Sequence, residues 1–228
     1  MEKINPRGIL FDMDGVLIDS EPFWRLAEHI VFDRFGITLS KEHFSYTTGL
    51  RNDEVVDIRI REWGLDPALR EQLMHDIIEV VVQHIETEGQ ATEGLPDVLN
   101  WIRERGIPAM IVTSSPLPVI RAVIRKLQLE GVLDRFVSAT EFEFGKPHPQ
   151  AYIEGYRRLG LQRSEVVVVE DSINGMLAAK AARIFTTVIP EKDNFENPRF
   201  SLADHKFSNW NEWLATMQIL FAETVQLS

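Results

Sequence analysis

Four consecutive valines, residues 166–169, constrain the fold of this chain more than any other feature. A strand without polar alternation is typical of a sheet that is covered on both faces. Other short apolar runs, separated by segments of helical periodicity, lie at residues 8–11, 107–113, 136–140 and 184–189. Strands that alternate with helices in this way indicate a parallel sheet with helices on both sides. We therefore expect an α/β fold with a doubly wound, mostly parallel sheet, followed by a loop at residues 191–199 and a terminal helix at residues 210–225.

Residues 18–90 interrupt this alternation, because their apolar residues repeat at helical spacing and no strand pattern occurs among them. Asn52 can cap the start of one of these helices. A glycine-containing break at residues 89–94 precedes the next strand and helix unit. These patterns predict a small helical domain of residues 18–90, inserted into an α/β core domain of residues 1–17 and 91–228.

Composition limits the partners of the chain. The formal net charge of −11 disfavours a nucleic-acid surface or an anionic membrane as partner, because both require basic residues. The chain has no cysteine, so it has neither disulfides nor thiolate chemistry, and this fits a reducing compartment. No signal-peptide core and no membrane-spanning run occur in the sequence. We therefore expect a cytoplasmic protein without nucleic-acid or membrane partners, and a monomer.

Two acids, Asp12 and Asp14, follow the first apolar run directly, and Gly15 then allows the backbone to turn. Side chains two residues apart on a strand point to the same face, so both carboxylates project beyond the end of the strand. Two carboxylates about 4 Å apart repel by roughly 4 kcal/mol at an effective dielectric constant near 20. We therefore expect a positive charge beside them.

Polar residues also follow the other predicted strands. A Thr-Ser-Ser cluster begins at Thr113, Lys146 lies in a Gly-Lys-Pro-His-Pro loop, and Glu170 and Asp171 follow the valine run. Ligands of doubly wound sheets bind outside the carboxyl ends of the strands, so these groups are expected at one rim. Carboxylates without histidine or thiolate clusters suit Mg²⁺, and hydroxyls with a lysine complement phosphate oxygens. A carboxylate can attack phosphorus, and a second acid can protonate the leaving oxygen.

These motifs resemble those of the haloacid dehalogenase (HAD) superfamily of phosphotransferases, in its branch with a helical cap after the first motif. Residues 11–21 match the first motif, Thr113 the second, Lys146 the third, and residues 170–175 the acidic fourth, all in the family's order. The resemblance implies a Rossmann-like core with a small inserted all-helical cap domain. Within the family, the chain is most similar to bacterial sugar-phosphate phosphatases of the 2-deoxyglucose-6-phosphate or hexitol-phosphate type, with beta-phosphoglucomutase also similar.

The resemblance also implies roles for the catalytic and metal-binding residues. Asp12 would be the nucleophile and Asp14 the general acid and base. Asp12, the backbone carbonyl of Asp14, and Asp171 would hold Mg²⁺, with Glu170 near the ion.

Phosphate and substrate contacts follow from the same resemblance. Thr113, Ser114 and Lys146 would bind the phosphoryl group. Arg51 lies in a cap segment that resembles the substrate-facing loop of these phosphatases, so it is a candidate substrate ligand; an exposed salt bridge is the alternative. His148 either lines the site or stabilises its loop. The tryptophans lie on apolar helix faces and are expected in the core; they are Trp24, Trp63, Trp101, Trp210 and Trp213.

The resulting prediction is a Mg²⁺-dependent phosphatase of carbohydrate metabolism that hydrolyses sugar or sugar-alcohol phosphates through an aspartyl-phosphate on Asp12. Its partner is a small phosphorylated metabolite. A phosphomutase of the beta-phosphoglucomutase type is the alternative enzyme; it requires the phosphorylated intermediate to survive until the bound sugar reorients, and the sequence does not exclude this. A non-catalytic phospho-acceptor switch is an alternative of another class, although such proteins carry the phosphorylated aspartate on a middle strand and lack a helical insertion.

Overall fold

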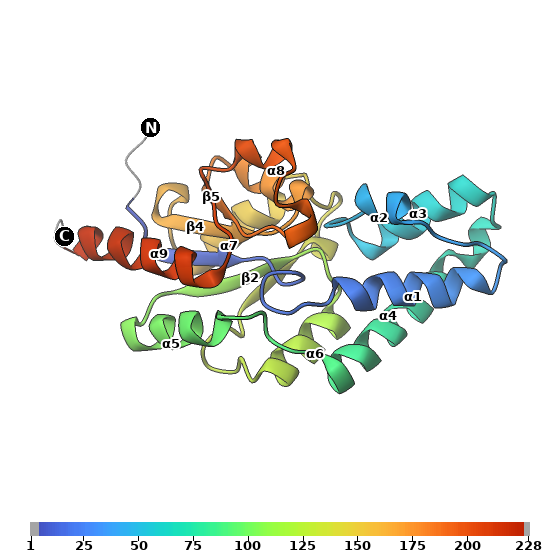
Figure 1. Cartoon of the computed structure of the whole chain (residues 1–228), viewed down its shortest axis with the longest axis horizontal. Coiled ribbons are helices and arrows are strands. Elements are labelled where there is room, and N and C mark those ends of the chain that lie inside the picture. The colour runs from blue at the N-terminus through green and yellow to red at the C-terminus, as the bar shows by residue number, and fades with distance from the viewer. Residues whose placement is uncertain (1–4, 226–228) are drawn as a thin grey trace.

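The computed structural model describes residues 5–225, and in this range the chain forms a six-stranded sheet in which all neighbouring strands are parallel (Figure 1). In chain order the strands are β1 (Gly8–Phe11), β2 (Ala109–Thr113), β3 (Phe136–Ser138), β4 (Val166–Glu170), β5 (Phe185–Val188) and β6 (His205–Lys206). Their order across the sheet is β3-β2-β1-β4-β5-β6. The predicted α/β fold with a doubly wound sheet is confirmed.

Strand β1 lies in the middle of the sheet, where Leu10 pairs with Met110 of β2 and Val168 of β4. All residues of these three strands are buried, which explains why the valine run lacks polar alternation. The chain continues from β1 to β2 and β3 on one side and then crosses to β4 on the other. The reversal of strand order therefore falls between β1 and β4, and ligands of such sheets bind outside the carboxyl ends of the strands at this point.

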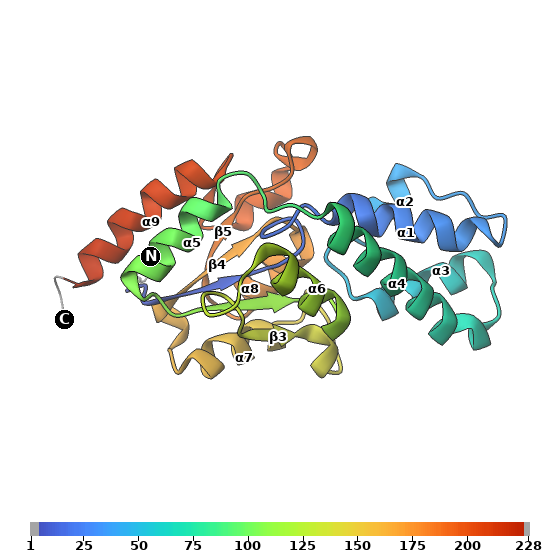
Figure 2. The ribbon, with the colours of Figure 1, turned by 90° about the horizontal axis from the view of Figure 1, so that it is seen from below.

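Helices cover both faces of the sheet (Figure 2). One face carries α5 (Leu95–Arg105), α6 (Leu117–Leu127) and α9 (Trp210–Val225), and the other carries α7 (Gln150–Leu159) and α8 (Ile173–Ala181). Alternate residues of β1 belong to different apolar clusters: Ile9 and Phe11 lie in the cluster of Trp213, and Leu10 lies in that of Tyr152. Both faces are thus buried, as the sequence predicts.

Four helices lie beside the carboxyl ends of the strands, at the right of Figure 1. They are α1 (Glu21–Asp33), α2 (Lys41–Ser45), α3 (Asn52–Trp63) and α4 (Arg70–Glu88). Helices α1 and α4 pack against each other, and α4 also packs on α6 of the core. Two segments connect this helical group to the core, and Ile18 of the first forms isolated bridges with Asp14 and with Ala91 of the second. A domain boundary at residues 18–90 stays a prediction.

Several short elements differ from the sequence-based expectation. Helix α2 and strand β6 were not predicted, because five and two residues are too few for a recognisable period. The segment 191–199 contains a 3₁₀ turn at Lys192–Asn194 and the start of another at Pro198–Leu202, where only a loop was expected. Within residues 5–225, no helix combines the length and apolar character needed to cross a membrane.

Candidate active site

The acidic residues at the carboxyl end of β1 lie beside those at the carboxyl end of β4. Glycine is required at Gly15, because its φ is +76° and a Cβ there would lie 2.0 Å from Asp171 Oδ2. A Cβ at Gly175 would likewise overlap the carboxylate of Glu170. These two glycines therefore allow the turn after β1 and helix α8 to approach the acidic residues closely.

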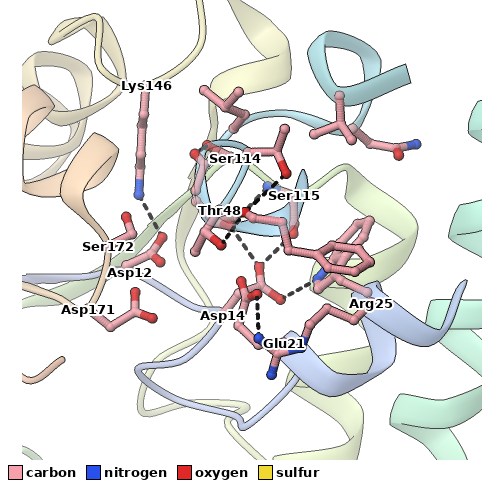
Figure 3. A pocket seen from close by; sticks show the side chains of 18 of the residues that line it. Asp12, Asp14, Glu21, Arg25, Thr48, Ser114, Ser115, Lys146, Asp171 and Ser172 are labelled. Carbon is pink, nitrogen blue, oxygen red and sulfur yellow. Dashed lines mark hydrogen bonds and ion pairs between the residues drawn. The ribbon is translucent and has the colours of Figure 1, made fainter. Parts of the chain in front are cut away.

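Asp12, Glu170 and Asp171 form a buried cluster, in which one carboxylate oxygen from each residue lies within 4.8 Å of those of the other two. Asp12 and Asp171 are labelled in Figure 3. Burial, and then the charge of Glu170, raise the pKa of Asp12 well above its usual value, and Lys146 opposes this rise. Burial and the charges of Glu170 and Asp12 also raise the pKa of Asp171. A divalent cation would relieve this repulsion, and buried carboxylate oxygens are ligands that Mg²⁺ prefers. The residues present therefore fit the predicted metal.

Lys146 is buried within the same cluster. Its Nζ lies 2.6 Å from Asp12 Oδ1 and 2.7 Å from Glu170 Oε1, and it also donates to Val112 O at 3.0 Å. Burial acts to lower the pKa of Lys146, but Asp12 and Glu170 outweigh this effect and raise it above the ordinary value. Tyr152, a residue that sequence reasoning missed, donates its hydroxyl to Glu170 Oε1 at 2.6 Å. Lys146 is therefore a fixed positive charge beside Asp12.

Asp14 has a separate set of partners on each carboxylate oxygen. Its Oδ1 accepts from Ser20 Oγ at 2.5 Å and from Trp24 Nε1 at 3.0 Å. Its Oδ2 accepts from Ser115 Oγ at 2.6 Å and from Thr113 Oγ1 at 3.4 Å. Trp24 packs against the apolar core as predicted, but it is only partly buried, and its indole also lines the cavity and donates to Asp14. Sequence reasoning missed these contacts of Ser20, Trp24 and Ser115, although the Ser-Ser pair after Thr113 could have indicated the last.

Residues at the carboxyl end of β2 contact the helical group of α1 to α4. Thr113 Oγ1 accepts from the backbone N–H of Ser115 at 3.0 Å, which closes a tight turn after β2. Ser114 Oγ donates to Gly49 O at 2.8 Å, in the loop between α2 and α3. Asn174 Nδ2 donates to Thr48 O of the same loop at 2.9 Å. The loop therefore lies directly over the carboxyl ends of the strands.

A cavity lies between this loop, helix α1 and the acidic residues. Six of the eight predicted site residues line it, namely Asp12, Asp14, Thr113, Ser114, Lys146 and Asp171. The parallel topology thus brings together residues that are far apart in sequence. Glu170 lies directly behind them, bound to Lys146.

Helix α1 contributes a face of polar residues to the cavity, which includes Glu21, Arg25 and Glu28. Burial, and then the negative charge of Asp14, raise the pKa of Glu21 to about 8, and Arg25 opposes the rise. The guanidinium of Arg25 lies 3.9 Å from Glu21 Oε2 and 3.7 Å from Glu191 Oε1 of the core. Arg25 is thus shared between two carboxylates.

Arg51 and His148 do not line this cavity. The Arg51 guanidinium donates to the carbonyls of Phe142 at 2.7 Å and Ala139 at 3.3 Å, and to Asp53 at 2.9 Å. A substrate contact of Arg51 stays a prediction, and it would require the guanidinium to leave these carbonyls. The ring of His148 lies against that of Phe144, with the two planes tilted by 40°, and it lines a separate surface groove beside the loop.

Comparison with known proteins agrees with this geometry. Residues 6–183 match the family model of the haloacid dehalogenase-like hydrolases. The chain belongs to this family. The predictions of the family and of a hydrolytic enzyme are thereby confirmed.

Relatives of known sequence and structure cover most of the chain. It is 35% identical to hexitol phosphatase B of Escherichia coli K12 over 214 residues, which is 92% of this chain and 96% of the relative. It is 29% identical to a phosphorylated carbohydrates phosphatase of Thermotoga maritima over 178 residues, 77% of this chain and 81% of the relative. The crystal structure of CbbY from Rhodobacter sphaeroides in complex with phosphate is similar with a TM-score of 0.81 at 25% identity, covering 91% of this chain and 96% of CbbY. Beta-phosphoglucomutase from Clostridium difficile shares the fold, with a TM-score of 0.82 at 18% identity, covering 96% and 99%.

Proposed function

We propose that this chain is a Mg²⁺-dependent phosphatase that hydrolyses monophosphates of sugars or sugar alcohols through an aspartyl-phosphate on Asp12. The observation that carries the proposal is the environment of Asp12. Its Oδ1 is held by Lys146, and its Oδ2 accepts no hydrogen bond from any residue in the described range. Asp12 therefore offers one free carboxylate oxygen to the cavity. The names of the relatives, hexitol phosphatase B and phosphorylated carbohydrates phosphatase, support a sugar phosphate as substrate.

The metal would be held by Asp12, Asp171 and the backbone carbonyl of Asp14, with Glu170 behind them. When bound, Mg²⁺ would neutralise charge on the carboxylates and on the phosphoryl oxygens. Thr113, the backbone at Ser114 and Lys146 would hold the remaining phosphoryl oxygens.

Two displacements complete the proposed reaction. In the first, Asp12 Oδ2 forms a bond to phosphorus while the bond from phosphorus to the ester oxygen breaks, and Asp14 gives its proton to the leaving alkoxide. In the second, Asp14 takes a proton from water, the water oxygen bonds to phosphorus, and the aspartyl-phosphate bond breaks to release phosphate. The four donors around Asp14 hold its carboxyl in one orientation for both steps.

The charges on the cavity wall formed by helix α1, which we call the cap side, favour a phosphatase over a phosphomutase. A mutase of this type would hold a bisphosphate, whose second phosphate would lie on the cap side. This part of the cavity contains Glu28, and the cation on the same face of α1, Arg25, already lies 3.7 Å from Glu191 Oε1 of the core. A second phosphate would be repelled there, whereas a neutral hydroxylated chain would not.

The test is a screen for phosphate release with the purified chain in Mg²⁺ and in EDTA. The substrates are hexitol 6-phosphates, 2-deoxyglucose 6-phosphate, glucose 1-phosphate and p-nitrophenyl phosphate. We expect Mg²⁺-dependent release of phosphate from the sugar or sugar-alcohol phosphates, and none with Asp12→Asn. Formation of glucose 6-phosphate from glucose 1-phosphate would support the mutase instead, and stoichiometric phosphorylation without turnover would support the phospho-acceptor switch.

A further inference from the structure

One face of helix α1 lines the cavity, and it consists of Glu21, Trp24, Arg25 and Glu28. The last three residues follow Glu21 by three, four and seven positions, which places all four on the same side of the helix. Of these four residues, Glu21 is the acid whose pKa is raised by the nearby charge of Asp14. Glu28 is two turns further along the helix, about 10.5 Å along its axis from Glu21. Glu28 therefore lies on the part of the cavity wall remote from the reacting phosphoryl group.

Glu28 is held in place by Arg59 of α3, which is fully buried. Arg59 Nε donates to Glu28 Oε2 at 2.9 Å, and its terminal nitrogens donate to His43 O at 3.0 Å and to Thr47 Oγ1 at 3.3 Å. The guanidinium also lies within 5.9 Å of three aromatic rings, those of Phe44, Tyr46 and Trp63. Arg59 thus has one orientation, and so has the carboxylate bound to it.

The second carboxylate oxygen of Glu28, Oε1, has no hydrogen-bond donor among the described residues. Only 8% of the side chain is accessible. The oxygen itself is not fully buried, so it can accept a hydrogen bond from a molecule in the cavity, either water or a ligand. A ligand hydroxyl in the cavity would supply the missing donor.

We infer that Glu28 is a specificity-determining residue, whose Oε1 accepts a hydrogen bond from a substrate hydroxyl remote from the phosphate, and that Arg59 is the residue that positions it. This inference rests on the proposed function. Because Glu28 is two helical turns from Glu21, the hydroxyl belongs to a chain of several carbons, and a three-carbon phosphate is too short to reach it. The same carboxylate disfavours substrates with a second anionic group at that end.

The test compares Glu28→Gln with the matched control Glu62→Gln. Glu62 also binds Arg59, at 3.3 Å, but it is one-third exposed and does not line the cavity. The kinetic constants of both variants and the wild type are measured with a hexitol 6-phosphate, glycerol 3-phosphate and p-nitrophenyl phosphate. We expect Glu28→Gln to lower kcat/KM for the hexitol phosphate at least about tenfold, mainly through KM, because Arg59 would hold the amide oxygen and the charged acceptor at Oε1 would be replaced by an NH2 group. Glycerol 3-phosphate is too short to reach Glu28, and p-nitrophenyl phosphate has no hydroxyl to donate. The constants for these two substrates, and all those of Glu62→Gln, should change by less than about threefold.

A second variant separates recognition from stability. Glu28→Met combined with Arg59→Met removes the acceptor without leaving a buried charge unpaired. It should lose the preference for the hexitol phosphate over glycerol 3-phosphate while it still hydrolyses p-nitrophenyl phosphate.

The outcomes distinguish this inference from the proposed function. An unchanged hexitol preference in both Glu28 variants, an equal loss with all three substrates, or a wild type that does not prefer the hexitol phosphate would overturn the inference alone. A wild type that hydrolyses no phosphate monoester would overturn the proposed function itself.

Discussion

The ammonium of Lys146 lies 2.6 Å from the carboxylate of Asp12, a residue 134 positions earlier in the chain, and both side chains are almost completely buried. When ionised, the three clustered carboxylates of Asp12, Glu170 and Asp171 carry a charge of −3, and Lys146 reduces the total to −2. A divalent cation would balance this charge. Lys146 thus partly neutralises the cluster and still leaves one oxygen of Asp12 free.

Removal of this ammonium should destabilise the fold. Lys146→Met leaves Asp12 and Glu170 buried without their counter-ion, so we expect the free energy of unfolding at pH 7 to fall by about 3–5 kcal/mol. The loss should be smaller at pH 5, because protonated carboxyls need no counter-ion, and smaller when Glu170→Gln is added. Urea unfolding in EDTA measures these differences.

Lys41→Met is the matched control for this experiment. Lys41 forms an ion pair of similar length with Asp193, at 3.0 Å, but both side chains are exposed. Its loss should leave the free energy of unfolding nearly unchanged, because water screens an exposed ion pair. Equal effects of the two substitutions would contradict the role of Lys146 in neutralising the cluster.

Asp171→Asn should separate the stability of the apoprotein from metal binding. In EDTA the variant should be at least as stable as the wild type, because the substitution removes one of three mutually repelling carboxylates. Saturating Mg²⁺ should stabilise the wild type, by about 2.7 kcal/mol at a concentration 100 times Kd, but not the variant. Thermal unfolding with and without Mg²⁺ measures both effects. An equal shift in the two proteins would place the metal elsewhere.

Asp14→Asn should affect leaving groups unequally. An alkoxide needs a proton to leave, so hydrolysis of a hexitol phosphate should fall by about 10²–10⁴-fold. p-Nitrophenolate leaves without a proton, so the first step should persist with p-nitrophenyl phosphate while breakdown of the phospho-enzyme is slow. Stopped-flow absorbance should then show a burst of one p-nitrophenolate per enzyme. Wild-type rates in both steps would remove Asp14 from the acid and base role.

The sequence predicts the sheet and the composition of its rim because both depend on topology. Parallel strands place their carboxyl ends at one edge, so Asp12, Thr113, Lys146 and Asp171 meet whatever the lengths of the segments between them. Their clustering in one cavity therefore follows from the order of strands and helices. Their roles in catalysis stay predictions.

The cap side of the cavity could not be predicted in the same way. Trp24 and Glu28 lie on a helix face whose period is the same for residues that point to a core and residues that point to a cavity. The donation of Trp24 to Asp14 depends on how α1 is placed over the sheet, and the pairing of Glu28 with Arg59 depends on the packing of α1 against α3. Tyr152 was missed for a similar reason, because its ring lies in the core and only its hydroxyl reaches Glu170.

The pKa of Glu21 has a consequence for the pH dependence of stability. It is raised from 4.5 to about 8, first by burial and then by Asp14, so the folded chain keeps a proton on Glu21 that the unfolded chain releases above pH 4.5. The free energy of unfolding should therefore fall as the pH rises from about 4.5 to 8, with a slope from this group of up to about 1.4 kcal/mol per pH unit. Glu21→Gln cannot ionise, so its advantage in stability over the wild type should grow across this window and level off above pH 8. Urea unfolding of both proteins in EDTA at pH 5, 6.5 and 8 measures the difference, and parallel pH profiles would show that the Glu21 carboxyl is already ionised in the folded chain.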